Sequence, residues 1–296
     1  MNARSPRPLR TSSYLAVLAE GDDLRIGIDI HDQHPVPAAG VAGFQAHAEH
    51  WQSRVAAGAI TNGVTIAPIA LRQEGSSVFI AAVAEDYVTN RAAASCWAAL
   101  PPSQRVLTVA EQGFDPAYSR FLGTACAVIG SDGLLILARR SQHTATEPGC
   151  WAPALGEGMD GADLRRDGTA DVLGCVLRGL EEELGISLDG EDAERCIRLQ
   201  AVTVNGRSGE IVVNGVIDFR QALNYRPTAA EVVDQAGACA VDTWERDRYA
   251  TIELTAEAVA AFARDTEADL SGYGSFTADL AIRAEPVASM EPGMAA

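Results

Sequence analysis

A short acidic segment carries the side chains best suited to chemistry in this sequence. Residues 178–186 are Arg-Gly-Leu-Glu-Glu-Glu-Leu-Gly-Ile, and they close a run with the apolar spacing of an α-helix. Arg178 and Glu182 are four residues apart, so on a helix they share one face and can form an ion pair. Neighbouring carboxylates make a dense anionic group that divalent cations neutralise. With Glu183, the segment suits a metal site in which Arg178 orients Glu182, but acidic helix ends of this kind also occur as solvated helix faces.

The segment resembles the second half of the Nudix box, the signature of the Nudix hydrolase family. The matching positions are Arg178, Leu180, Glu182, Glu183, Gly185 and Ile186. The resemblance covers about Phe121 to Asp247, where the expected order of elements is also that of the family. It implies that Mg²⁺ or Mn²⁺ is held by the box glutamates and that water cleaves a pyrophosphate bond. Glu182, Arg178 and Glu183 are then the expected catalytic residues.

Three positions depart from the box. Leu164 stands at its first glycine, Ala170 at its upstream glutamate and Gly179 at the glutamate after the arginine, so one carboxylate ligand is missing. Glu181 is a poor replacement, because it lies about 100° around the helix from Glu182. Glu157 lies in a loop that packs against the box helix in Nudix-like folds. We therefore expect Glu157 to be the substitute metal ligand.

Periodicity places the box in a second block of the chain. Strands are expected at Leu122–Ile129 and Leu134–Arg140, joined by a Gly-Ser-Asp-Gly hairpin turn, and at Cys150–Leu155. An apolar stripe predicts a helix that begins at Thr169 as N-cap and ends at Gly185. Further strands are expected at Ile197–Val204 and Glu210–Phe219, and helices at Thr255–Asp265 and Thr277–Arg283.

The first block has strand-like runs at Ser13–Ala19 and Leu24–His31, whose turn-rich linker predicts a hairpin. A helix is expected across Val41–Ala57, followed by strands at Val64–Leu71 and Val78–Val83. We therefore expect two domains: an α+β N-terminal domain over residues 1–118 and a Nudix-like domain over residues 119–290.

The resemblance also suggests substrate-binding residues. Arg139 and Arg140 end a strand that often faces the substrate in Nudix-like proteins, and one of them could meet a phosphate. Trp151 resembles the tryptophan that many members carry just before the box. Each has a structural alternative, since the arginines suit an exposed strand end and the tryptophan suits the core.

Other candidate residues are weaker. His31, His34, His47 and His50 form two pairs at a spacing of three, which suits a metal site on a helix but equally suits a solvent-facing surface. A general base could come from outside the box, and the sequence does not rank the four acidic candidates, Glu210, Asp218, Glu231 and Asp234.

Composition excludes several classes of function. All 23 basic residues are arginines, so chemistry that needs a lysine, such as a P-loop or a pyridoxal phosphate anchor, is excluded. With 40 acidic residues the net charge is −17, which disfavours a general nucleic-acid surface. The six cysteines form no C-x-x-C pair and no apolar run is long enough to span a membrane, so a cytoplasmic protein with reduced thiols is expected.

The expected fold is α/β: a Nudix-like α/β/α sandwich with a mixed sheet, preceded by the smaller α+β domain. The expected function is metal-dependent hydrolysis of a nucleoside diphosphate linked to another moiety, first of all a nucleotide sugar. The alternative is a catalytically inactive Nudix-fold module that binds a nucleotide or serves in regulation. The expected partner is a small nucleotide, with neither nucleic acid nor membrane, and a homodimer is a further expectation.

Overall fold

The computed structural model describes residues 15–32, 40–144, 147–240, 246–265 and 270–284. Its centre is a mixed sheet whose main path runs β1-β9-β10-β5-β6-β11, with β8 paired to β5 and β7 paired to β6. The strands are β1 (Leu15–Glu20), β5 (Leu122–Ile129), β6 (Leu134–Arg140), β7 (Trp151–Pro153), β8 (Leu155–Gly158), β9 (Ile197–Asn205), β10 (Ile211–Asp218) and β11 (Arg246–Glu253).

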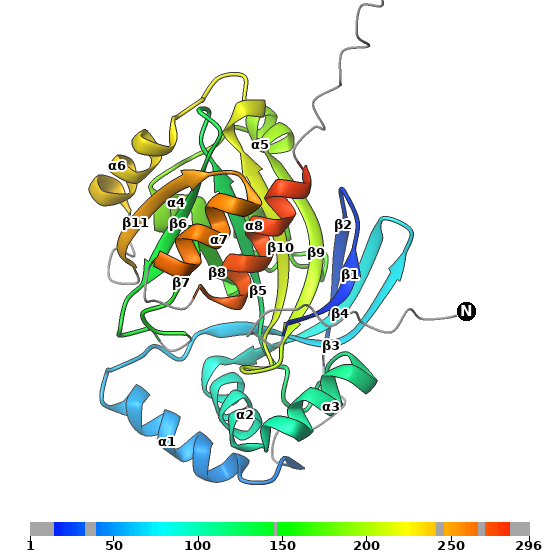
Figure 1. The fold of residues 1–296 in the computed structure, drawn as a ribbon. Coiled ribbons are helices and arrows are strands. Elements are labelled where there is room, and N and C mark those ends of the chain that lie inside the picture. Colours follow the sequence, from blue (N-terminus) through cyan, green and yellow to red (C-terminus); the bar gives the residue numbers. More distant parts are fainter. Residues whose placement is uncertain (1–14, 33–39, 145–146, 241–245, 266–269, 285–296) are drawn as a thin grey trace, which may run out of the picture.

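Helices cover both faces of this sheet, so the predicted α/β/α sandwich is confirmed (Figure 1). One face packs on α4 (Val172–Leu184), α5 (Gly190–Cys196) and α6 (Ala229–Cys239). The other packs on α7 (Ala256–Asp265) and α8 (Gly272–Ala284). Every residue of β5 and β10 is buried, because these central strands have a helical layer on each side.

The first block forms a smaller sheet with the order β2-β4-β3 and three helices. Its elements are β2 (Arg25–His31), α1 (Phe44–Ala56), β3 (Val64–Glu74), β4 (Ser77–Asp86), α2 (Tyr87–Ala99) and α3 (Pro102–Gln112). Helices α2 and α3 were not expected from the sequence. The two sheets share one apolar core, in which Ile28, Ile66 and Trp97 of the first block join Leu122 and Val213 of the second.

The predicted hairpin between the first two strands is wrong. β1 pairs antiparallel with β9 as an edge of the large sheet, whereas β2 pairs parallel with β4 in the small one. Leu15, Ala16 and Ala19 of β1 are buried, and this edge position lets β1 bury them in the cores of the large sheet. The strand therefore lies in the large sheet although it precedes the predicted boundary at residue 118. Ser13, the predicted start of this strand, lies outside the described residues.

Helix α4 has the predicted apolar stripe and the predicted end, but not the predicted start. Asp171 is the N-cap in place of Thr169, and its Oδ1 accepts the N–H of Gly174 at 2.9 Å. Thr169 instead bonds to Asp167 within the preceding loop. The helix stops at Gly185, whose φ of 67° is a left-handed conformation that glycine adopts without strain.

Candidate active site

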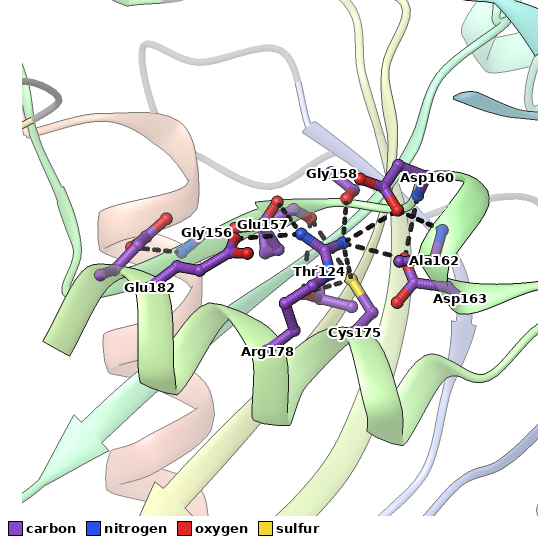
Figure 2. A network of polar contacts seen from close by, with 11 residues as sticks. Thr124, Gly156, Glu157, Gly158, Asp160, Ala162, Asp163, Cys175, Arg178 and Glu182 are labelled. Carbon is purple, nitrogen blue, oxygen red and sulfur yellow. Dashed lines mark hydrogen bonds and ion pairs between the residues drawn. The ribbon is translucent and has the colours of Figure 1, made fainter. Parts of the chain in front are cut away.

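Arg178 is the centre of the polar network between α4 and the loop that follows β8 (Figure 2). Its Nη1 lies 3.2 Å from Glu182 Oε2, the ion pair expected from the spacing, and 3.0 Å from Glu157 Oε1. Its Nη2 lies 2.9 Å from Asp163 Oδ2 and donates to the carbonyl oxygen of Gly158 at 2.9 Å. One guanidinium therefore fixes the relative positions of three carboxylates.

Glu157 occupies the space that the missing box glutamate leaves. A Cβ added to Gly179 would lie 2.9 Å from Glu157 Cβ and 3.3 Å from its Cγ, closer than side chains normally approach. Strand β8 alternates, so Leu155 and Glu157 face α4 while the glycines between and after them face away. The absence of a side chain at Gly179 is therefore what lets Glu157 lie against the helix.

The environment of Glu157 opposes its negative charge. Burial and the nearby carboxylate of Glu183 raise the pKa of Glu157 to about 8, although Arg178 acts in the opposite direction. Glu182 adds a smaller repulsion of the same kind. Glu182 and Glu183 thus lie close enough to Glu157 to disfavour its ionisation.

Glu183 is buried in an ion pair that the sequence did not predict. Its Oε2 lies 2.6 Å from Arg246 Nη2, and both side chains are 2% exposed. The same oxygen accepts the backbone N–H of Gly156 at 3.2 Å, which ties α4 to β8. Arg246 begins β11, 63 residues further along the chain, and no local pattern marks it as the partner.

The loop before α4 supplies two further acidic residues that the sequence analysis missed. Asp163 is 4% exposed, and besides binding Arg178 its Oδ2 accepts the N–H of Asp160 at 2.9 Å. Asp160 caps the short helical turn at Gly161–Asp163 and lies 3.8 Å from Arg178. A capping pattern of Asp160 with Asp163, three residues apart, was the signal that could have found them.

Strands β2 and β3 of the small sheet form backbone hydrogen bonds with this loop. Ile66 of β3 donates its N–H to Met159, while Ile30 donates to Gly168 and Ala170 donates to Ile28 of β2. Leu164 and Ala170, the two other departures from the box, bridge each other within the loop. The first block of the chain therefore shapes the segment that carries Glu157 and Asp163.

The predicted substrate-binding residues take different positions. Arg140 lines a cavity beside β5 and β8, whereas Arg139 donates its Nε–H to the carbonyl of Gly149 at 3.2 Å. Trp151 is 5% exposed and packs edge-on against Phe262, with ring centroids 5.0 Å apart, so it lies in the core.

The remaining candidates are largely outside the site. Glu210 is buried and lines the same cavity as Arg140, whereas Asp218 binds Arg220, Glu231 caps α6 and Asp234 is exposed. His31 and His50 are exposed, His47 is half-buried, and His34 lies outside the described residues. In the described part of the chain, no three His, Cys, Asp or Glu side chains converge as a ready metal site.

None of the helices that the structure describes is long and apolar enough to cross a membrane. The described cysteines form no disulfide, and Cys96, Cys126, Cys175 and Cys196 are buried.

Comparison with known proteins finds similar chains among the solved structures. No family model matches the chain, and no curated protein matches it by sequence. A bifunctional NMN adenylyltransferase/ADP ribose pyrophosphatase of Francisella tularensis, complexed with AMP and a manganese ion, is 17% identical with a TM-score of 0.38, over 67% of this chain and 50% of that one. A MutT/nudix family protein of Enterococcus faecalis is 15% identical with a TM-score of 0.30, over 54% of each chain.

A Deinococcus radiodurans structure is 15% identical with a TM-score of 0.35, over 58% of this chain and 88% of that one. The chain thus spans only about half the length of the Francisella and Enterococcus proteins. At these levels of similarity, the chemistry has to be judged from the site itself.

Proposed function

We propose that this protein is a divalent-metal-dependent hydrolase that cleaves the pyrophosphate bond of a nucleoside diphosphate linked to another moiety. One observation carries the proposal: the Glu157 side chain packs against Gly179 of α4. A carboxylate from β8 therefore lies next to the helix position at which the box has lost its glutamate. With Glu182 and Glu183, the set again contains three carboxylates.

The donor atoms fit Mg²⁺ or Mn²⁺ by chemical type, although these side chains do not converge on one point in the described part of the chain. Glu157, Glu182 and Glu183 offer only oxygen atoms, which are the ligands that hard dications prefer. The raised pKa of Glu157 reflects its burial and the negative charge of Glu183, which Arg178 offsets only in part, and a dication would favour the ionised carboxylate. When bound, such an ion neutralises charge on the phosphate oxygens and activates water for attack at phosphorus.

The protein's own residues have distinct tasks in this proposal. Arg178 positions Glu157 and Glu182, since it is within 3.2 Å of both. Arg246 positions Glu183 through the 2.6 Å contact. Arg140 lines the adjoining cavity and is the cation best placed to meet a substrate phosphate, whereas Arg139 is the weaker candidate because it holds the turn at Gly149. A nucleotide sugar is the substrate class tested first.

The test measures phosphate or nucleotide release from nucleotide sugars, dinucleotides and nucleoside triphosphates with Mg²⁺, with Mn²⁺ and after chelation. We expect release to require the metal and to be lost in Glu182→Gln and Glu157→Gln. Glu181→Gln is the matched control, because Glu181 lies on the same helix but is exposed. Release that survives chelation would overturn the proposal. Release that is equal in Glu182→Gln, Glu157→Gln and Glu181→Gln would overturn it as well.

A second candidate function is a non-catalytic nucleotide-binding module. It is favoured by the buried pair of Glu183 with Arg246, which already satisfies one of the three carboxylates. The two functions differ in their response to Glu182→Gln. A module would bind nucleotide with an affinity that stays within a few-fold in the variant and would release no product.

A further inference from the structure

A cavity of about 110 Å³ lies beside β5 and β8, next to the proposed metal site. Ala125, Val212 and Tyr273 line it and belong to the core layer beneath α8. Glu157 and Arg246 also line it, so the cavity adjoins the side chains that would act on a diphosphate. A substrate held at that site therefore has a pocket for a neighbouring group.

Glycines on the strands keep this cavity open. A Cβ at Gly156 would meet no atom closer than 3.9 Å, and the nearest side chain is that of Arg246. Cβ atoms at Gly123 and Gly158 would approach the ring of Phe121 to 2.9 Å and 2.8 Å. The ring can lie over the backbone only because both positions lack side chains, and it forms an apolar wall of the cavity.

Tyr273 brings an unsatisfied hydroxyl to the same cavity. Its side chain is only 9% exposed, and its buried Oη has no hydrogen-bond partner in the structure. Leaving a buried polar group unpaired is costly, so this hydroxyl is suited to a bound polar group.

Two carboxylates complete the polar wall. Glu210 is 7% exposed and Glu147 is half-buried, and both line the cavity with Tyr273. Burial and Glu210 raise the pKa of Glu147, whereas Arg140 and Asn205 lower it. Burial, Glu210 and Glu147 likewise raise the pKa of Tyr273 well above its usual value. Glu147, Glu210 and Tyr273 therefore line one cavity and can act on one ligand.

We propose that Glu147, Glu210 and Tyr273 bind two adjacent hydroxyl groups of a sugar ring in the substrate. A sugar hydroxyl donates to a carboxylate while it accepts from a phenol, so a pair of them satisfies both kinds of group. A doubly esterified diphosphate and an ionised carboxylate have no proton to donate to the two glutamates, so a hydroxyl suits these acceptors better, while Arg140 and Arg246 line the same cavity and suit the diphosphate. The inference deepens the proposed function and rests on it for the diphosphate that leads into the cavity.

The sugar could be the ribose of the nucleoside or the ring on the far side of the diphosphate, and three probes separate these sources. Binding of ADP, 2′-deoxy-ADP and ADP-ribose to the full chain is measured by calorimetry in EDTA, which prevents metal-dependent turnover. If the nucleoside ribose is bound, ADP should bind about tenfold more tightly than 2′-deoxy-ADP. If the far ring is bound, ADP-ribose should exceed ADP by about the same factor.

Variants assign the preference to these side chains. We expect Tyr273→Phe and Glu147→Gln each to reduce the hydroxyl-dependent preference several-fold. Because the Tyr273 hydroxyl has no partner, Tyr273→Phe should leave the melting temperature unchanged or raise it. The control is Tyr225→Phe, whose hydroxyl lies 2.7 Å from Gln235 Oε1 far from the cavity, and it should keep the full preference.

Failure of this inference is distinguishable from failure of the hydrolase proposal. Binding that never depends on a hydroxyl, or a preference that survives in both cavity variants, overturns the sugar site even if the chain hydrolyses nucleotides. A hydroxyl-dependent preference that the variants remove supports the site even if no hydrolysis is detected.

Discussion

Glu157 of β8 and Gly179 of α4 are packed so closely that a Cβ on the glycine would lie 2.9 Å from the Cβ of the glutamate. The Glu157 side chain therefore occupies the space that a side chain at position 179 would need. If a carboxylate from either position can serve as the same metal ligand, moving it from residue 157 of the strand to residue 179 of the helix should preserve function.

The first prediction exchanges the two residues. Glu157→Gly should lower hydrolysis by about 100-fold or more, because a ligand that places the cation is lost. Gly179→Glu alone should cost about 1–3 kcal/mol of unfolding free energy from overpacking. The double variant should recover activity and stability relative to both single variants. Kinetics and denaturant unfolding measure this, and a double variant as inactive as Glu157→Gly would contradict it.

The second prediction concerns the buried pair of Arg246 and Glu183. Arg246→Met leaves the Glu183 charge buried without its partner and should cost roughly 3–5 kcal/mol in urea unfolding. Combining it with Glu183→Leu should recover much of that loss, since no charge is then buried. Arg248→Gln is the control on the same strand, because Arg248 is exposed. Equal losses in the two arginine variants would show that burial of the pair is unimportant.

The third prediction is a pH dependence of stability without metal. The pKa of Glu157 is about 8 in the folded protein, above the ordinary value of 4.5, so the folded state binds more protons than the unfolded state between these limits. The unfolding free energy should therefore fall as pH rises from about 5 to 8, with a contribution of at most about 1.4 kcal/mol per pH unit from this group.

This dependence should be reduced in Glu157→Gln and when Mg²⁺ is added, since neither the amide nor a metal-bound carboxylate takes up the proton. Urea unfolding across this pH range in EDTA makes the measurement. A wild-type slope that the glutamine variant retains would assign the proton to another group.

The fourth prediction separates positioning from stability in the loop. Asp163→Asn removes the charge that binds Arg178 at 2.9 Å and should lower kcat by about tenfold, with KM changed less, because the guanidinium orients Glu157 and Glu182 less firmly. Asp160→Asn is the matched control, since its contact with Arg178 is 3.8 Å and its side chain is 46% exposed. Steady-state kinetics of the two variants should differ clearly, and equal effects would argue against a positioning role.

Local patterns were sufficient for the elements that carry the box. The apolar stripe of α4, its end at Gly185 and the ion pair of Arg178 with Glu182 all depend on residues a few positions apart, where helix geometry fixes the outcome. The hairpin of β5 and β6 and the helices α7 and α8 followed from similar signals, whereas α5 and α6 were not expected.

Long-range pairing had to be seen in three dimensions. The pairing of β1 with β9 joins residues 181 to 190 positions apart, from Glu20 with Ala201 to Leu15 with Asn205, and Arg246 meets Glu183 across 63 residues. Such partners depend on which apolar surfaces can be buried together and which buried charges can be paired. Hydrophobic periodicity describes only local sequence, so it does not identify these partners. The missing carboxylate at Gly179 is visible in the sequence, but its replacement by Glu157 is a contact between a strand and a helix that packing alone creates.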